Sequence, residues 1–280
     1  SPSRSPGMEL RKSPTGLSLF PNQLELPADL STGFLRAAPG AYRVFSTLPN
    51  AKSGTLVLAV VSMKLESLLQ YLDNWLHVSE HPDYTTALNG LQVGGPSEVE
   101  TVVTAVDASE ASILAAADLG ADLMIVHHGL FWSGLEPIVG RQERRLRALF
   151  DANIALYSVH LPLDSHMEVG NCALLARAIG LEVKGRLGGY KGHDIGVWGE
   201  LAQPTAVENL QRLVALAVGG GEVRSLPGGP DTVHSVGVLT GGGASFVKEA
   251  AEAGLDAFVT GEGAHNTYFD ATEFGIHVLF

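Results

Sequence analysis

The stretch DLMIVHHGLFW, residues 122–132, places two adjacent histidines at the end of an apolar run. The run itself is typical of a buried β-strand. On a regular strand, neighbouring side chains point to opposite faces. Gly129 favours a turn here, because glycine tolerates φ values that are closed to other residues. We therefore expect the backbone to turn at the strand end, so that His127 and His128 converge on one site.

Strand-like and helix-like segments alternate around this stretch. Near-continuous apolar strands in such an alternation favour an α/β fold, with a sheet that is at least partly parallel and covered by helices on both faces. The pattern predicts strands over 99–107, 121–126 and 154–159, and helices over 108–120, 141–153 and 171–180.

A strand, helix, strand unit occurs twice in the chain. Residues 116–129 (AADLGADLMIVHHG) align without gaps with residues 250–263 (AAEAGLDAFVTGEG), and the strands before them also correspond. A generic likeness between βαβ units is the alternative, but we favour a duplication. The predicted fold class is therefore α/β, with duplicated βαβ-type units and mixed, largely parallel sheets covered by helices. In this alignment, the two histidines correspond to Gly261 and Glu262.

A third histidine follows the next predicted strand. The segment SVHLPLD, residues 158–164, contains His160 and, four residues later, Asp164. The carboxyl ends of strands in open α/β sheets are where ligands bind. Imidazoles with a carboxylate suit Zn, Mn, Fe, Co or Ni better than Ca or Mg. We predict a metal site formed by His127, His128, His160 and Asp164.

Other candidate residues are weaker. TGGGAS, residues 240–245, is a glycine-rich turn that resembles a phosphate cradle, but it lacks the GK[ST] of a P-loop and a tight turn is favoured. His265 is placed either in the same cleft or on the surface, and Cys172 is assigned to the core. The histidines without any partner spacing are read as structural or exposed: His77, His81, His166, His193, His234 and His277.

Composition narrows the class of protein. The 280 residues are 45% hydrophobic and carry a formal charge of −12, which disfavours binding to nucleic acid because that affinity depends on clustered Lys and Arg. The single cysteine excludes an internal disulfide and a thiolate-rich zinc site. No apolar run approaches the roughly 18 residues of a membrane span. These features predict a soluble, cytoplasmic protein.

The two ends of the chain differ from its middle. Residues 1–62 lack sustained periodicity, whereas an amphipathic helix is predicted directly after Met63. We expect residues 1–62 to be an N-terminal extension, disordered or from a mis-called start, although a small subdomain is an alternative. The final strand-like segment, FGIHVLF, stops at Phe280, and the repeat aligns IHVLF with the residues before His160. We expect the natural reading frame to continue with a His and, four residues later, a Glu.

The order of motifs resembles that of a known family, the NIF-three-like dinuclear metal proteins, also called GTP cyclohydrolase 1 type 2 homologues. The resemblance covers residues 63–280, and it implies a domain that lacks its C-terminal metal-ligand motif. It also implies two divalent metal ions held in part by the four predicted ligands, and a homohexamer. The motifs are ALNGLQV (87–93), VDAS (106–109), DLMIVHHGLFW (122–132), SVHLPLD (158–164), EVGN (168–171) and AFVTGEG (257–263).

Three functions follow as hypotheses. The leading one is a metal-dependent hydrolase, in which metal-activated water attacks a nucleotide or phosphoester. The second is a non-catalytic metal-binding scaffold or chaperone. The third is a nucleotide-binding module that uses the 240–245 turn without a metal. A small-molecule substrate and self-association are the expected partners, neither a membrane nor nucleic acid is expected, and no catalytic residue is assigned.

Overall fold

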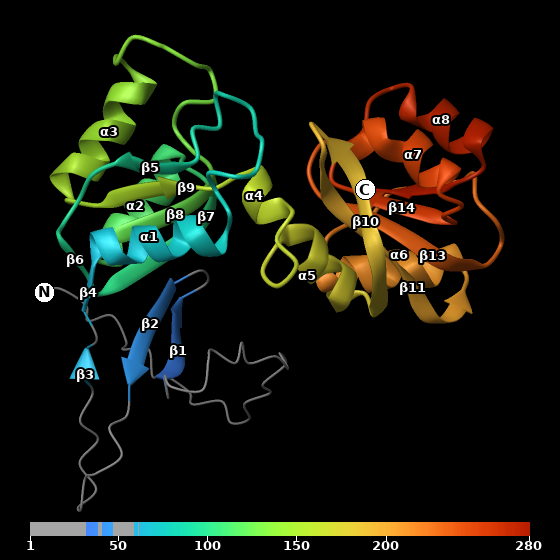
Figure 1. Cartoon of the computed structure of the whole chain (residues 1–280), viewed down its shortest axis with the longest axis horizontal. Coiled ribbons are helices and arrows are strands. Elements are labelled where there is room, and N and C mark those ends of the chain that lie inside the picture. The colour runs from blue at the N-terminus through green and yellow to red at the C-terminus, as the bar shows by residue number, and fades with distance from the viewer. Residues whose placement is uncertain (1–31, 39–40, 47–58, 61) are drawn as a thin grey trace, which may run out of the picture.

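The structure, a computed structural model, describes residues 32–38, 41–46, 59–60 and 62–280. The chain forms two lobes, each built around one sheet (Figure 1). In the first lobe, three parallel strands form the centre: β7 (Thr101–Asp107), β8 (Leu123–His128) and β9 (Ala155–Ser158). Antiparallel strands flank them: β1 (Thr32–Ala38), β2 (Ala41–Ser46) and β3 (Ala59–Val60) beyond β7, and β5 (Gly90–Val93) beside β9.

Helices cover both faces of this sheet, as the apolar strands predicted. Residues of β8 alternate between the two faces, so Leu123 packs in the core under one helix while Met124 packs in the core on the other side. The first core lies under α1 (Leu65–Trp75), and the second lies under α2 (Glu110–Asp118) and α3 (Arg141–Asp151).

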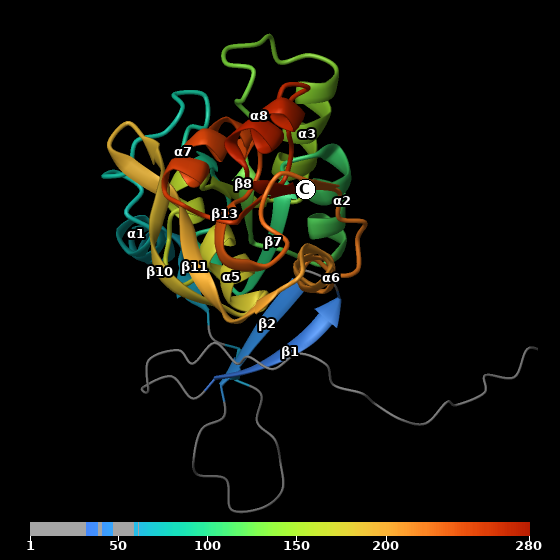
Figure 2. The ribbon, with the colours of Figure 1, turned by 90° about the vertical axis from the view of Figure 1, so that its right-hand side faces the viewer.

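The second lobe repeats the layered arrangement. Its parallel centre is β13 (Val233–Leu239), β14 (Ala257–Thr260) and β15 (His277–Leu279), with antiparallel β11 (His193–Thr205), β10 (Leu181–Tyr190) and β12 (Ser225–Leu226) at the sides. Figure 2 shows helices above and below the sheet. One face carries α5 (Asn171–Ala178) and α6 (Val207–Ala217), and the other carries η1 (Gly243–Phe246), α7 (Val247–Glu252) and α8 (Thr267–Phe274).

Matched hydrogen bonds show that the two βαβ units repeat the same local structure. Asp122 Oδ2 accepts the backbone N–H groups of Glu100 and Thr101 at 2.8 and 2.9 Å. Asp256 Oδ2 accepts those of His234 and Ser235, both at 2.8 Å. In each lobe, one aspartate therefore ties the start of the first parallel strand to the start of the second. The mixed α/β fold is confirmed, with parallel pairing confined to the centre of each sheet.

The predicted extension over 1–62 lies mostly outside the described residues, and the boundary at Met63 remains a prediction. Directly after that position, β4 (Met63–Lys64) pairs with β6 (Glu98–Val99), and α1 begins at Leu65 as its helical spacing predicted. Within the described ranges, no helix is both long and apolar enough to cross a membrane.

Candidate metal centre

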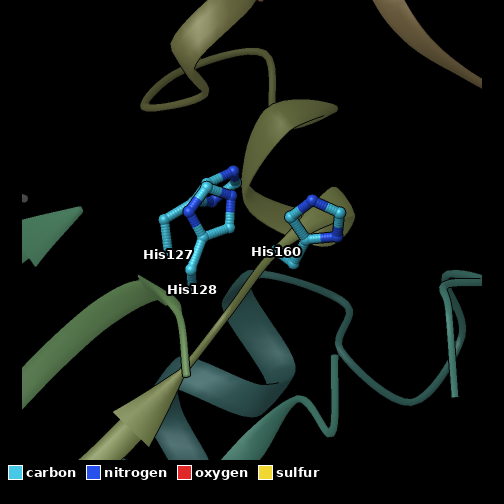
Figure 3. A group of neighbouring side chains, drawn as sticks. All are labelled: His127, His128 and His160. Carbon is cyan, nitrogen blue, oxygen red and sulfur yellow. The ribbon is translucent and has the colours of Figure 1, made fainter. Parts of the chain in front are cut away.

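The fold brings the three predicted histidines together beside the carboxyl end of the first sheet. His127 and His128 are the last residues of β8, and His160 immediately precedes α4 (Leu161–Asp164). One ring nitrogen from each histidine lies within 4.8 Å of the others. Figure 3 shows the three rings gathered at one place, with centroid separations of 4.6, 4.8 and 5.6 Å.

The strand end differs from the expected turn. Strand β8 continues through both histidines, yet their rings converge because they occupy the last two positions of the strand. Gly129 does not adopt a positive φ. A Cβ there would lie 2.3 Å from the side-chain nitrogen of Gln92, so a larger residue would displace the Gln92 amide. The Gln92 side chain fixes the segment by accepting the Leu130 N–H at 2.8 Å and donating to the Ala87 carbonyl.

The spacing of His160 and Asp164 follows from the short helix between them. Residues four apart on a helix are neighbours, and Pro162 suits the first turn because its missing N–H needs no partner there. Asp164 Oδ2 lies 3.4 Å from Nε2 of His127. Asp164 Oδ1 accepts the Asn171 amide at 2.7 Å, which leaves the other oxygen facing the histidines.

Each histidine is oriented through its Nδ1 atom. The Nδ1 of His127 lies 3.1 Å from the Val159 carbonyl, which can only accept a hydrogen bond. The Nδ1 atoms of His128 and His160 donate to carboxylates at 2.8 and 2.9 Å. All three rings therefore direct the lone pair of Nε2 away from these partners. An outer hydrogen bond of this kind fixes the tautomer of histidines that bind metals.

The two carboxylates that orient the rings are Asp107 and Asp83. Asp107 pairs with His128 across β7 and β8, so both side chains project from the same face of the sheet. Asp83 has a side chain only 6% exposed and accepts further hydrogen bonds from the Asn89 amide and the Leu161 N–H. Burial alone raises the pKa of Asp83, but the hydrogen bonds from His160 and Asn89 outweigh it and hold the pKa below its ordinary value.

Asp164 has the corresponding effect on His127. Burial lowers the pKa of this imidazole, but the hydrogen bond and negative charge of Asp164 outweigh burial, so the pKa is raised. The site therefore attracts positive charge at Nε2, where a proton and a metal ion compete. Three imidazoles and one carboxylate form a mixed nitrogen and oxygen donor set that fits the borderline transition metals.

A cavity of about 950 Å³ adjoins this cluster and reaches the second lobe. Trp132 stands edge-on against the rings of His128 and His160, with centroids 5.5 and 4.7 Å away. Tyr84 and Tyr190 line the cavity, and their rings lie 5.3 Å apart. The cavity is thus partly aromatic and large enough for a small organic molecule.

The glycine-rich turn lines the same cavity from the second lobe. Gly241 adopts φ +71°, and its carbonyl accepts the N–H groups of Gly243, Gly261 and Glu262. This network supports the interpretation as a tight turn. Glu262 lines the cavity, whereas His265 is exposed and does not line it; Cys172 is buried as predicted.

Sequence reasoning missed the supporting residues. Asp107, Gln92 and Asn171 lie in motifs quoted above, and a polar residue beside an apolar strand was the available signal. Asp83 lies in none of those motifs. Its contact with His160 spans 77 positions, so nothing local in the sequence indicated it.

The fold and the histidine cluster define a mixed α/β protein with a candidate transition-metal centre beside a cavity between two related lobes. Residues 63–280 match the family described as Duf34/NIF3 (NGG1p interacting factor 3), and the chain belongs to that family.

Relatives and solved structures agree with this assignment. A GTP cyclohydrolase 1 type 2 homolog of Halobacterium salinarum is 42% identical over 220 residues, covering 78% of this chain and 86% of that protein. Its Escherichia coli counterpart is 41% identical over 216 residues, covering 77% and 85%. A solved structure described as protein ybgI, unknown function, superposes with a TM-score of 0.72 at 40% identity, covering 78% of this chain and 85% of that one.

Proposed function

We propose that this protein is a metal-dependent hydrolase that holds two divalent ions, of the Zn, Mn, Fe, Co or Ni class, in part through His127, His128, His160 and Asp164. The observation that carries the proposal is the orientation of the three imidazoles. Each uses Nδ1 for a protein partner and directs Nε2 away from that partner, and all three residues line a cavity. When bound, the ions would lower the pKa of water and polarise a substrate oxygen.

The surrounding residues favour a substrate with a planar ring. Tyr84 and Tyr190 present aromatic surface in the same cavity, and such surfaces stack on flat rings. Trp132 shields the histidines on one side, which strengthens electrostatic interactions by excluding water. Thr240 and Glu262 line the cavity from the second lobe as polar groups able to exchange hydrogen bonds with a substrate.

The substrate class follows from these features together with the relatives. Several relatives carry the name GTP cyclohydrolase 1 type 2 homolog, so a purine nucleotide is the substrate we propose first. A phosphoester is the second candidate, because an ion pair at such a site also suits phosphoryl groups. We propose a homohexamer as the assembly and the cytoplasm as its location.

One observation favours the alternative of a non-catalytic metal-binding scaffold or chaperone. Among the described residues that line the cavity, Arg177 is the only Lys or Arg. Its guanidinium donates to the carbonyls of Met167 and Glu168, so it is already engaged within the protein. A substrate phosphate would therefore depend largely on the metal ions for recognition.

Metal analysis combined with substrate profiling separates the two functions. We expect the purified protein to bind more than about one ion per chain and to turn over GTP or a phosphoester only when loaded. His128→Ala should abolish both properties, whereas His265→Ala, outside the cavity, should leave both unchanged. Bound metal without turnover on a broad panel of nucleotides and phosphoesters would favour the scaffold. Turnover that survives in metal-free protein would overturn metal catalysis.

A further inference from the structure

A second group of histidines lies outside the site described above. It lines a separate cavity of about 590 Å³. His81 comes from the loop after α1 in the first lobe, and His193 begins β11 in the second lobe. Neither residue contributes to the three-histidine cluster, so this cavity needs its own explanation.

The ring of His81 has one nitrogen fixed and the other unsatisfied. Its Nδ1 lies 2.9 Å from the Pro82 carbonyl, which accepts only, so Nδ1 carries the proton. Its Nε2 is buried and has no hydrogen-bond partner among the described residues. A buried acceptor without a partner is unfavourable, because it has lost its hydrogen bond to water. His128 and His160 of the first cluster show the same arrangement, with Nδ1 held by the protein and no protein partner for Nε2 among the described residues.

The ring of His193 lies as close to the ring of His81 as the rings of the first cluster lie to one another. The ring centroids of His81 and His193 are 5.0 Å apart, with an interplanar angle of 50°. The corresponding separations in the three-histidine cluster run from 4.6 to 5.6 Å, with angles of 47–48°. The two imidazoles are therefore arranged like the members of the first cluster, although they come from different lobes.

The other histidines of this cavity are already engaged. His166 uses Nε2 for the Trp75 carbonyl at 3.1 Å, and its Nδ1 faces the N–H groups of Glu168 and Val169. His77 is exposed and lies 3.3 Å from the Glu80 carboxylate. Only His81 and His193 therefore remain as candidate ligands among the imidazoles that line the cavity.

The charge around the cavity also favours a cation. Arg186 lines it, but the guanidinium donates to the carbonyls of Ser165 and Asp194. Three carboxylates line the same cavity, namely Glu80, Glu168 and Asp194, so negative groups outnumber the single guanidinium. Burial, followed by the nearby positive groups, lowers the pKa of His81, which keeps the ring neutral and its Nε2 lone pair available.

We propose that His81 and His193 bind one borderline divalent ion, such as Zn²⁺, Ni²⁺ or Cu²⁺, with water completing the coordination. Neutral imidazoles select this class of metal over Mg²⁺ and Ca²⁺. Because one ligand comes from each lobe, the bound ion joins the α1 loop to the start of β11. The site is independent of the proposed hydrolase function.

The test uses Ni²⁺ and Cu²⁺ alone, titrated calorimetrically into the full chain carrying His127→Ala, His128→Ala and His160→Ala. These substitutions remove the first cluster, and we expect about one ion per chain to remain bound. Adding His193→Ala should weaken this binding about tenfold or more, because one of two protein ligands is lost. Electron paramagnetic resonance of the Cu²⁺ form should show coupling to two imidazole nitrogens, and to one after the added substitution.

His77→Ala is the matched control, since His77 lines the same cavity but is paired with Glu80. It should leave the remaining ion in place. A second measurement avoids the triple variant: His193→Ala in the otherwise unchanged chain should lower the total ion count by about one per chain. The proposal fails if no ion remains in the triple variant, or if the remaining ion is insensitive to His193→Ala.

Discussion

The two lobes share one scaffold but differ at the edge where ligands gather. In the first lobe, β8 ends in His127 and His128, whereas the matched strand β14 is followed by Gly261 and Glu262. The buried positions correspond more closely: Ala116 and Ala250 are both 0% exposed, and Asp122 and Asp256 make the same pair of hydrogen bonds. Packing and strand alignment are therefore retained in both copies, while the chemistry at the strand ends has diverged.

The difference indicates which positions of a repeated fold carry the chemistry of a site. A residue that ties two strands together contributes to the stability of the sheet, whereas a residue just past a strand end can contact a ligand without bearing on the strand pairing. In this protein, the first lobe supplies the imidazoles and their orienting carboxylates. The second lobe supplies a polar and aromatic wall to the same cavity.

The largest expected effect is on metal affinity, and it compares a ligand of the first lobe with a strand-end residue of the second. His160→Ala should lower metal affinity by more than about 100-fold, because it removes a ligand rather than a supporting group. Glu262→Ala in the second lobe should change the affinity little. Isothermal titration with Zn²⁺ on both variants measures this. Equal losses in the two variants would show that both lobes provide ligands.

The second prediction concerns the shared scaffold. Asp122→Ala and Asp256→Ala should each lower the free energy of unfolding by about 2–3 kcal/mol, since each leaves two backbone N–H groups without a charged acceptor. Urea denaturation of the metal-free variants provides the measurement. A large loss of unfolding free energy in one variant and none in the other would show that the two aspartates are not equivalent. Asp118→Ala, at the end of α2, is a surface control.

The third prediction compares two orienting carboxylates within the first lobe. Asp83→Asn should weaken metal binding by about 10–100-fold, because its buried carboxylate fixes the tautomer of His160. Asp107→Asn should have a smaller effect, since the Asp107 side chain is 65% exposed and water can replace it beside His128. Zn²⁺ competition with a chromophoric chelator ranks the two. A stronger effect from Asp107→Asn would contradict this account of burial.

Much of this comparison could be predicted from sequence, for reasons that differ by residue. The alternation of strand-like and helix-like segments and the gapless repeat predicted the parallel centres of both sheets. Both signals are local, because they depend on the spacing of apolar residues and on glycines at turns. The rule that ligands bind at the carboxyl ends of strands predicted that His127, His128, His160 and Asp164 lie together. The role of Asp83 could not be predicted, since it depends on a loop that packs against a residue distant in sequence.

One expectation about local structure needed correction. Gly129 was expected to permit an unusual φ, but its φ is not positive, and a Cβ there would instead meet the Gln92 side chain. This contact is tertiary, because Gln92 lies on β5 and Gly129 follows β8, and a local pattern does not encode it.

The smallest expected effect is a pH dependence confined to the first lobe. In the metal-free protein, His127 has a raised pKa because Asp164 outweighs burial, and Asp83, His128 and His160 also face this ring. A group whose pKa is raised on folding stabilises the protein fully below its unfolded value of about 6.5. That contribution is lost as the pH rises through the folded pKa. Wild-type protein should thus lose more stability than His127→Gln between about pH 6 and about pH 8.5, the range that brackets histidine titration.

Urea denaturation in the presence of a chelator at each pH measures this difference. Glu262→Gln serves as the control from the second lobe, where Gly261 occupies the position of His127 and no imidazole titrates. Metal-loaded protein should respond in the opposite direction, because the ion binds neutral imidazole and is displaced by protons as the pH falls. The prediction is wrong if the free energy of unfolding follows the same pH profile in wild-type and His127→Gln proteins without metal. Asp164 would then not hold a proton on His127, and the first lobe would have no pH dependence that the second lacks.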